Sequence, residues 1–126
     1  MTFRLLSVDL VIAIHDEVLN PGELPGFALD KSLDGALARV DNRMAYGMVE
    51  DVLDLAAAYA VAIAIGSCFN DANKRTAYES MVVCLQLNDI VLRPVVDAIG
   101  PIIIEVAQGN MDEATLAKWL RGSMDG

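Results

Sequence analysis

Residues 69–76 carry the densest set of polar and charged side chains in the chain. They read Phe-Asn-Asp-Ala-Asn-Lys-Arg-Thr and separate two apolar runs, 55–65 and 77–87. The first backbone N–H groups of a helix have no partner within that helix, so a helix that starts in this stretch would attract anions. Lys74 and Arg75 would add two cationic groups at the same place. These residues predict a site for phosphate groups.

Asp71 stands just before the basic pair and suggests a bound magnesium ion. Magnesium is usually held by one or two carboxylates together with phosphate oxygens. An alternative is a capped helix start, with Asp71 or Asn73 as the N-cap residue and with Lys74 and Arg75 paired to surface acids. Spacing alone leaves both interpretations open, because short loops of this composition are common.

The polar stretch is expected to be a loop positioned by the helices on either side of it. The spacing of apolar residues along the chain predicts six helices in all. The expected ranges are 7–19, 32–45, 50–65, 73–87, 101–108 and 112–121. The third and fourth are apolar on most sides, which is typical of helices buried in the middle of a domain. Pro101 is placed at the first position of the fifth helix, where its missing N–H removes no hydrogen bond. We therefore predict an all-α fold, a compact bundle of about six helices forming a single domain over residues 1–126.

Composition narrows the classes of function. The chain has 126 residues and a formal net charge of -9, with 18 acidic against 9 basic residues. This balance opposes direct nucleic-acid binding, which needs a basic face, and favours a basic protein partner. The longest apolar run is too short to cross a membrane. Two cysteines and an N-terminus unlike a signal peptide predict a cytoplasmic protein with reduced thiols.

Several residues outside the polar stretch have more ordinary expected roles. His15, the single histidine, is expected to be a partly buried surface residue near a helix end rather than a ligand. Arg39 and Arg43, four residues apart, are expected on a solvated helix face, although they could also pair with Asp residues or contact a ligand. Cys68 is expected to be a small buried apolar residue, and Phe69 a plug that pins the loop to the core.

The segment 68–77 resembles the active-site motif of the Fic/Doc family, His-x-Phe-x-(Asp/Glu)-(Gly/Ala)-Asn-(Gly/Lys)-Arg. Its Ala-Asn-Lys version is similar to the Doc branch, whose members are toxins of toxin–antitoxin modules. Residues 12–16 and 24–26 resemble the first helix and the flap of that branch. The resemblance implies a compact helical domain that uses ATP and Mg²⁺ to transfer a phosphate or AMP group to a hydroxyl of a target protein.

The resemblance also implies roles and partners. It implies that Asp71 binds the metal ion and that Asp71, Lys74 and Arg75 are catalytic residues. The implied nucleotide-binding residues are Asn70, Ala72, Asn73, Lys74 and Arg75. The implied target is translation elongation factor Tu or a similar protein, and the implied inhibitor is an antitoxin of the Phd type.

One catalytic position departs from the family pattern, because Ser67 stands where the family has its catalytic His. That His is the general base, and losing a positioned base slows a reaction by about 10²- to 10⁴-fold. A serine hydroxyl is not basic near neutral pH. Ile65 and Glu79 replace an Arg and an Asn of the Doc branch. We therefore expect an inactive or attenuated enzyme, with a non-catalytic module that binds an antitoxin or regulator as the alternative.

Overall fold

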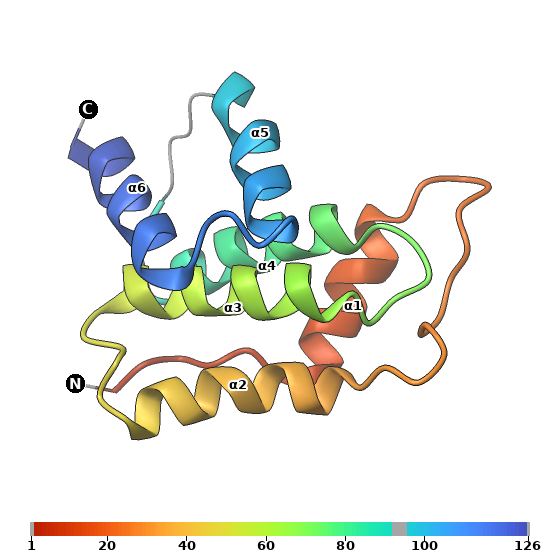
Figure 1. The fold of residues 1–126 in the computed structure, drawn as a ribbon, viewed down its shortest axis with the longest axis horizontal. Helices are drawn as coiled ribbons and strands as arrows, with labels where there is room; N and C mark the ends of the chain where they lie inside the picture. Colours follow the sequence, from red (N-terminus) through yellow and green to blue (C-terminus); the bar gives the residue numbers. More distant parts are fainter. Residues whose placement is uncertain (1, 92–95, 126) are drawn as a thin grey trace.

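The computed structural model describes residues 2–91 and 96–125, and this part of the chain folds into six α-helices (Figure 1). In chain order they are α1 (Val8–Val18), α2 (Leu33–Ala45), α3 (Val52–Gly66), α4 (Asn73–Leu87), α5 (Val96–Ala107) and α6 (Glu113–Asp125). These described residues form no strand, only one isolated bridge. The predicted all-α fold is confirmed. No helix among them has the length and apolar character needed to cross a membrane.

The first three helices begin at side-chain caps. In each, an oxygen of the N-cap residue accepts the backbone N–H of the residue three positions later, which would otherwise lack a partner. The capping pairs are Ser7 with Leu10, Ser32 with Gly35 and Asp51 with Asp54. The sequence predicts Ser7 as the N-cap residue of the first helix, because Ser at the start of an apolar-periodic segment is a common cap, and the structure confirms it.

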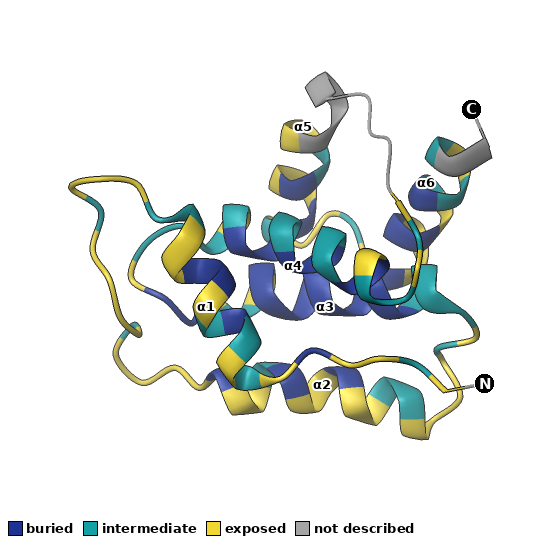
Figure 2. Ribbon diagram, turned by 180° about the vertical axis from the view of Figure 1, so that it is seen from behind, coloured by how far each residue is buried: buried dark blue, intermediate teal, exposed yellow. Residues whose placement is uncertain are grey.

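Helix α3 is the centre of the molecule. All ten residues from Leu55 to Ala64 are buried, which confirms the prediction from its apolar surface. It packs against α2, α4, α5 and α6, and its contact with α4 is the most extensive. Figure 1 shows α2 on one side of α3 with α5 and α6 on the other, and Figure 2 shows the burial of α3. Because α1 packs against α4, the connection from α3 to α4 lies close to α1.

The last two helices are longer than predicted. Helix α5 begins at Val96, so Pro101 lies inside it and not at its start, and α6 continues through Gly122 to Asp125. An interior Pro removes one backbone hydrogen bond and an interior Gly weakens a helix by about 1 kcal/mol. Tertiary packing can outweigh such local penalties. The sequence also predicts a short extended piece at 90–92, before Pro94, and residue 92 lies outside the described residues.

The α2 face that carries Arg39 and Arg43 is only partly solvated, because 50% of the Arg39 side chain and 23% of the Arg43 side chain are exposed and both residues pair with Glu113 of α6. Glu113 is only 7% exposed, and its Oε1 accepts hydrogen bonds from Arg39 Nη2 at 2.9 Å and Nε at 3.2 Å. Arg43 Nη1 lies 3.6 Å from the other carboxylate oxygen. Because Glu113 is buried, it needs these two guanidinium groups, and the pairs link α2 to α6.

Candidate functional site

The candidate site is built on two loop segments that lie antiparallel beside each other. Phe27 and Phe69 form the isolated bridge. The Ala28 N–H donates to the Cys68 carbonyl at 2.8 Å, and the Asn70 N–H donates to the Gly26 carbonyl at 3.0 Å. The backbone of residues 26–28, in the loop after α1, therefore supports residues 67–72, the loop between α3 and α4 that we call the motif loop.

Asn73 holds the motif loop from the other side. Its side-chain oxygen accepts the Phe69 N–H at 3.0 Å, while its Nδ2 donates to the Phe69 carbonyl at 2.8 Å. The Phe69 ring is 3% exposed, which confirms its predicted role as a plug. Asn70 lies at the exposed edge of the loop, where its Nδ2 donates to the Pro25 carbonyl at 3.0 Å. These bonds fix the loop before any ligand arrives.

Helix α4 begins without a side-chain cap. Its N-cap residue is Ala72, which has a left-handed backbone with φ of 67° and makes no side-chain hydrogen bond to the helix. The alternative in which Asp71 or Asn73 caps the helix is therefore wrong. A non-glycine residue in this conformation is uncommon and destabilises the loop slightly, as is often found at functional sites. The uncapped start leaves backbone N–H groups of α4 suited to an anion.

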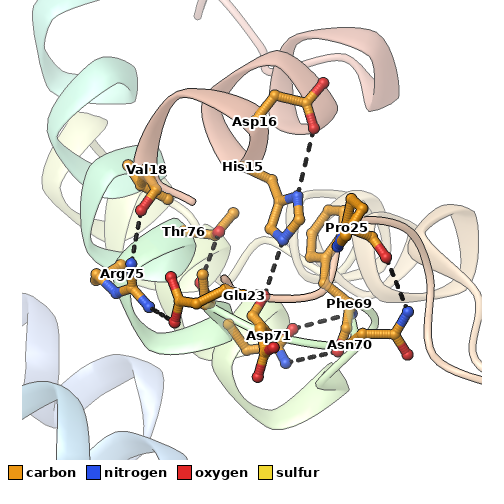
Figure 3. Close-up of polar contacts among 12 residues, drawn as sticks. His15, Asp16, Val18, Glu23, Pro25, Phe69, Asn70, Asp71, Arg75 and Thr76 are labelled. Atoms are coloured by element: carbon orange, nitrogen blue, oxygen red, sulfur yellow. Dashed lines mark hydrogen bonds and ion pairs between the residues drawn. The ribbon is translucent and has the colours of Figure 1, made fainter. Parts of the chain in front are cut away.

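Asp71 is held through both its side chain and its main chain, and Figure 3 shows the main-chain contact with His15. Its Oδ2 accepts the Leu24 N–H at 2.7 Å. Its carbonyl oxygen lies 2.8 Å from Nε2 of His15, and the His15 ring stacks on Phe69 with 3.8 Å between ring centroids. His15 is 1% exposed, so the expectation of a surface histidine was wrong.

The two basic residues of the motif have different surroundings. Arg75 donates from Nη1 to the Val18 carbonyl at 2.6 Å and from Nη2 to the Glu23 carboxylate. The hydrogen bond from Arg75 lowers the pKa of Glu23 below its usual value. Lys74 is exposed and takes part in none of the ion pairs formed by the described residues. The predicted pairing with an acid therefore holds for Arg75 alone.

Ser67 is the C-cap residue of α3 and is exposed. Its backbone is left-handed, with φ of 46° and ψ of 46°, and its hydroxyl donates to the Ala64 carbonyl at 3.2 Å. The hydroxyl is not a base, and His15 cannot take its place, because His15 is buried and its Nε2 is bonded to Asp71. The site thus has no histidine base facing solvent within the described residues.

A cavity of 660 Å³ brings the candidate residues together. All seven of them line it: Ser67, Asn70, Asp71, Ala72, Asn73, Lys74 and Arg75. The remaining lining comes from Ala64 of α3 and from Ile104, Ala107 and Gln108 at the end of α5 and just after it. A neighbouring apolar pocket of 480 Å³ shares Lys74, Arg75 and Ile104 and adds Glu79. Ile65 is 41% exposed.

Asp71 is the carboxylate that could hold a metal ion in the larger cavity. The described part of the chain has no group of three or more His, Cys, Asp or Glu suited to a metal. A divalent ion at Asp71 would therefore depend on phosphate oxygens and water for its other ligands, which is how magnesium is commonly bound. The residues fit a metal that arrives with a phosphate ligand.

Comparison with known proteins agrees with this geometry. The profile of the Fic/DOC family matches residues 5–85, which include α1 and the whole motif loop. The protein described as "Protein kinase doc", from Escherichia phage P1, is 34% identical over 121 residues, an alignment that covers 94% of each chain. The similarity therefore extends over nearly the full length of both proteins.

Proposed function

Because the chain belongs to the Fic/DOC family, we propose that it is a Doc-like toxin of a toxin–antitoxin module with an attenuated transfer activity. Its reaction is the ATP-dependent transfer of a phosphate or AMP group to a hydroxyl of a translation factor, such as elongation factor Tu, in the cytoplasm. An antitoxin of the Phd type is its inhibitor. The observation that supports this most is the single 660 Å³ cavity lined by all seven candidate residues.

In this proposal the start of α4 binds the phosphates of ATP. The uncapped backbone N–H groups and the partial positive charge of the helix end attract the phosphate oxygens. The exposed Lys74 ammonium adds a full charge that is not engaged elsewhere in the described structure. Arg75 contributes from the same cavity, with one guanidinium nitrogen already bonded to Glu23. Charge neutralisation of this kind is the main protein contribution to phosphoryl transfer.

Asp71 would hold Mg²⁺ in the proposed complex. When bound, that ion would neutralise charge on the nucleotide phosphates. The Asp71 carboxylate is already oriented, because its Oδ2 is bonded to the Leu24 N–H. Asn70, Ala72 and Asn73 shape the loop that surrounds the phosphates. Attenuation follows from Ser67, since no solvent-facing histidine of the described residues can remove the proton of the target hydroxyl.

The test is transfer of label from ATP with magnesium and elongation factor Tu, using the chain as it stands and its Ser67→His variant. We expect transfer by the variant to be about 10²- to 10⁴-fold faster, because a positioned base contributes that much. Equal activity of the two proteins would refute attenuation at Ser67. Absence of transfer by both, together with intact ATP binding, would refute this target and reaction.

A non-catalytic module is the second candidate, and two observations favour it. Ser67 lacks the chemistry of a base, and Arg75 is paired with Glu23 rather than free. In this case the chain acts by binding an antitoxin or regulator. An antitoxin tail peptide should then bind Ser67→His, Asp71→Ala and Lys74→Ala with the affinity of the unchanged chain, while none of them transfers label. Transfer by Ser67→His would exclude this candidate.

A further inference from the structure

His15 is a buried polar side chain that contacts the motif loop directly. It comes from α1, 56 residues before the loop residue to which it bonds. Its side chain is 1% exposed, and its ring lies nearly parallel to the Phe69 ring, with an angle of 7° between the two planes. A buried polar group needs a hydrogen-bond partner, and the Asp71 carbonyl oxygen at 2.8 Å supplies one.

The partner atom shows that Nε2 of the ring carries a proton. A carbonyl oxygen only accepts hydrogen bonds, so Nε2 of His15 carries the proton and donates it. The other ring nitrogen, Nδ1, lies 3.6 Å from an Asp16 carboxylate oxygen, which is too long for a hydrogen bond. The ring is therefore oriented by two contacts, the stack on Phe69 and the bond to Asp71. Both belong to the motif loop.

Asp71 is also the candidate metal ligand. The hydrogen bond from His15 to the Asp71 carbonyl oxygen can therefore affect metal binding. His15 holds the carbonyl of Asp71 while the Leu24 N–H holds its carboxylate, so two neighbouring segments fix the same residue from both ends. Sites that bind a metal with a nucleotide depend on such supporting contacts, because a small displacement of a ligand weakens binding. We infer that His15 is a positioning residue of the metal–nucleotide site and acts through Asp71.

This inference rests on the proposed function and concerns magnesium more than the nucleotide. Lys74 and the start of α4 would still attract the phosphates of ATP if Asp71 moved, because the hydrogen bond and the ring stack of His15 are made to Asp71 and Phe69. Loss of the His15 bond should therefore reduce the gain in ATP affinity that magnesium provides, and leave the magnesium-free affinity nearly unchanged. A residue with only a structural role would lower both affinities together.

The experiment is calorimetric titration of the full chain with ATP, with and without magnesium, for five proteins: unchanged, His15→Phe, His15→Gln, Asp71→Ala and the double variant His15→Phe with Asp71→Ala. His15→Phe keeps an aromatic ring against Phe69 but has no N–H to donate. Asp71→Ala removes the carboxylate and keeps the carbonyl that His15 contacts. His15→Gln is the second substitution at this position and retains an N–H donor. Thermal unfolding of each protein shows that it is folded.

We expect His15→Phe to reduce the magnesium-dependent gain on the order of fivefold, the effect of losing one ordinary hydrogen bond. His15→Gln should recover part of that gain. In the Asp71→Ala background, His15→Phe should have no further effect on it, since residues that act through one another are not additive. Equal losses with and without magnesium, or additive losses in the double variant, would overturn the inference alone. Absence of ATP binding by the unchanged chain would overturn the proposed function and this inference together.

Discussion

The two basic residues of the motif should behave differently when each is replaced by Ala. Both line the 660 Å³ cavity, but Lys74 is exposed without an ion pair among the described residues, whereas Arg75 is bonded to Val18 and Glu23. Lys74→Ala should therefore weaken ATP binding without changing stability. Arg75→Ala should weaken binding and also loosen the contact between α4 and the end of α1.

The magnitudes follow from the kind of contact that each side chain makes. A hydrogen bond to a charged group contributes about 1.5–3 kcal/mol, so losing the Lys74 contact with a phosphate should weaken ATP binding by about 10- to 150-fold. The Arg75 side chain is 41% exposed, so solvent screens its ion pair with Glu23. We expect Arg75→Ala to lower the free energy of unfolding by about 1 kcal/mol, chiefly through the lost bond to the Val18 carbonyl.

Calorimetric titration with ATP and denaturant unfolding measure these two quantities for each variant. Lys118→Ala is the matched control, because it removes the same charge from an exposed position on α6 away from the cavity. If Lys74→Ala binds ATP no more weakly than Lys118→Ala, Lys74 is not a phosphate ligand. If Lys74→Ala destabilises the fold as much as Arg75→Ala, the distinction between a free and an engaged cation is wrong.

Three further predictions concern stability. Phe69→Ala should lower the free energy of unfolding by about 3–5 kcal/mol in denaturant titrations, because a buried aromatic ring is lost; a loss below 1 kcal/mol would contradict its role as a plug. Burial is the largest single influence on the pKa of Asp51 and raises it, but the hydrogen bond and charge of Arg121, together with hydrogen bonds from the Asp54 and Leu53 backbone, outweigh burial and hold that pKa below the ordinary 3.8. Asp51 therefore stabilises the fold above pH 3.8, and this contribution is lost as the pH falls through the lowered pKa. The fall in melting temperature over that range should be smaller in Asp51→Asn, and identical curves would refute the assignment. Glu113→Gln should destabilise the chain by about 2 kcal/mol, since the Arg39 guanidinium would lose a charged partner; an unchanged melting temperature would show that this link between α2 and α6 is not needed.

The sequence allowed the fold to be predicted where local signals were strong. The apolar surface of the segment around Leu55–Ala64 predicted the buried central helix, and the polar stretch after it predicted the loop that all seven candidate residues share. Pairings between distant residues could not be predicted in this way. No local pattern indicates that His15 reaches a loop 56 residues later, or that Arg39 meets Glu113 from 74 residues away. Such contacts depend on how the helices pack, which spacing along the chain does not specify.

The pairing of Arg75 with Glu23 illustrates the same limit within the site. A basic residue in the first turn of a helix runs against the preference for acids there and so pointed to an anionic ligand. The structure supplies an anion from the chain itself, in a segment after α1 without a regular pattern. Sequence reasoning could find the unusual charge but not its partner.

The bonds that shape the motif loop have an evolutionary consequence. They come from His15, Asn73, Leu24 and the backbone of 26–28, and none of them uses the Ser67 side chain, whose hydroxyl bonds only within the end of α3. Position 67 has a left-handed backbone, which His adopts more readily than branched residues do. Whether position 67 carries a base is therefore independent of the hydrogen bonds that stabilise the loop. A single substitution at position 67 could introduce a histidine or remove one, while the contacts that hold the loop and the stability they provide stayed the same.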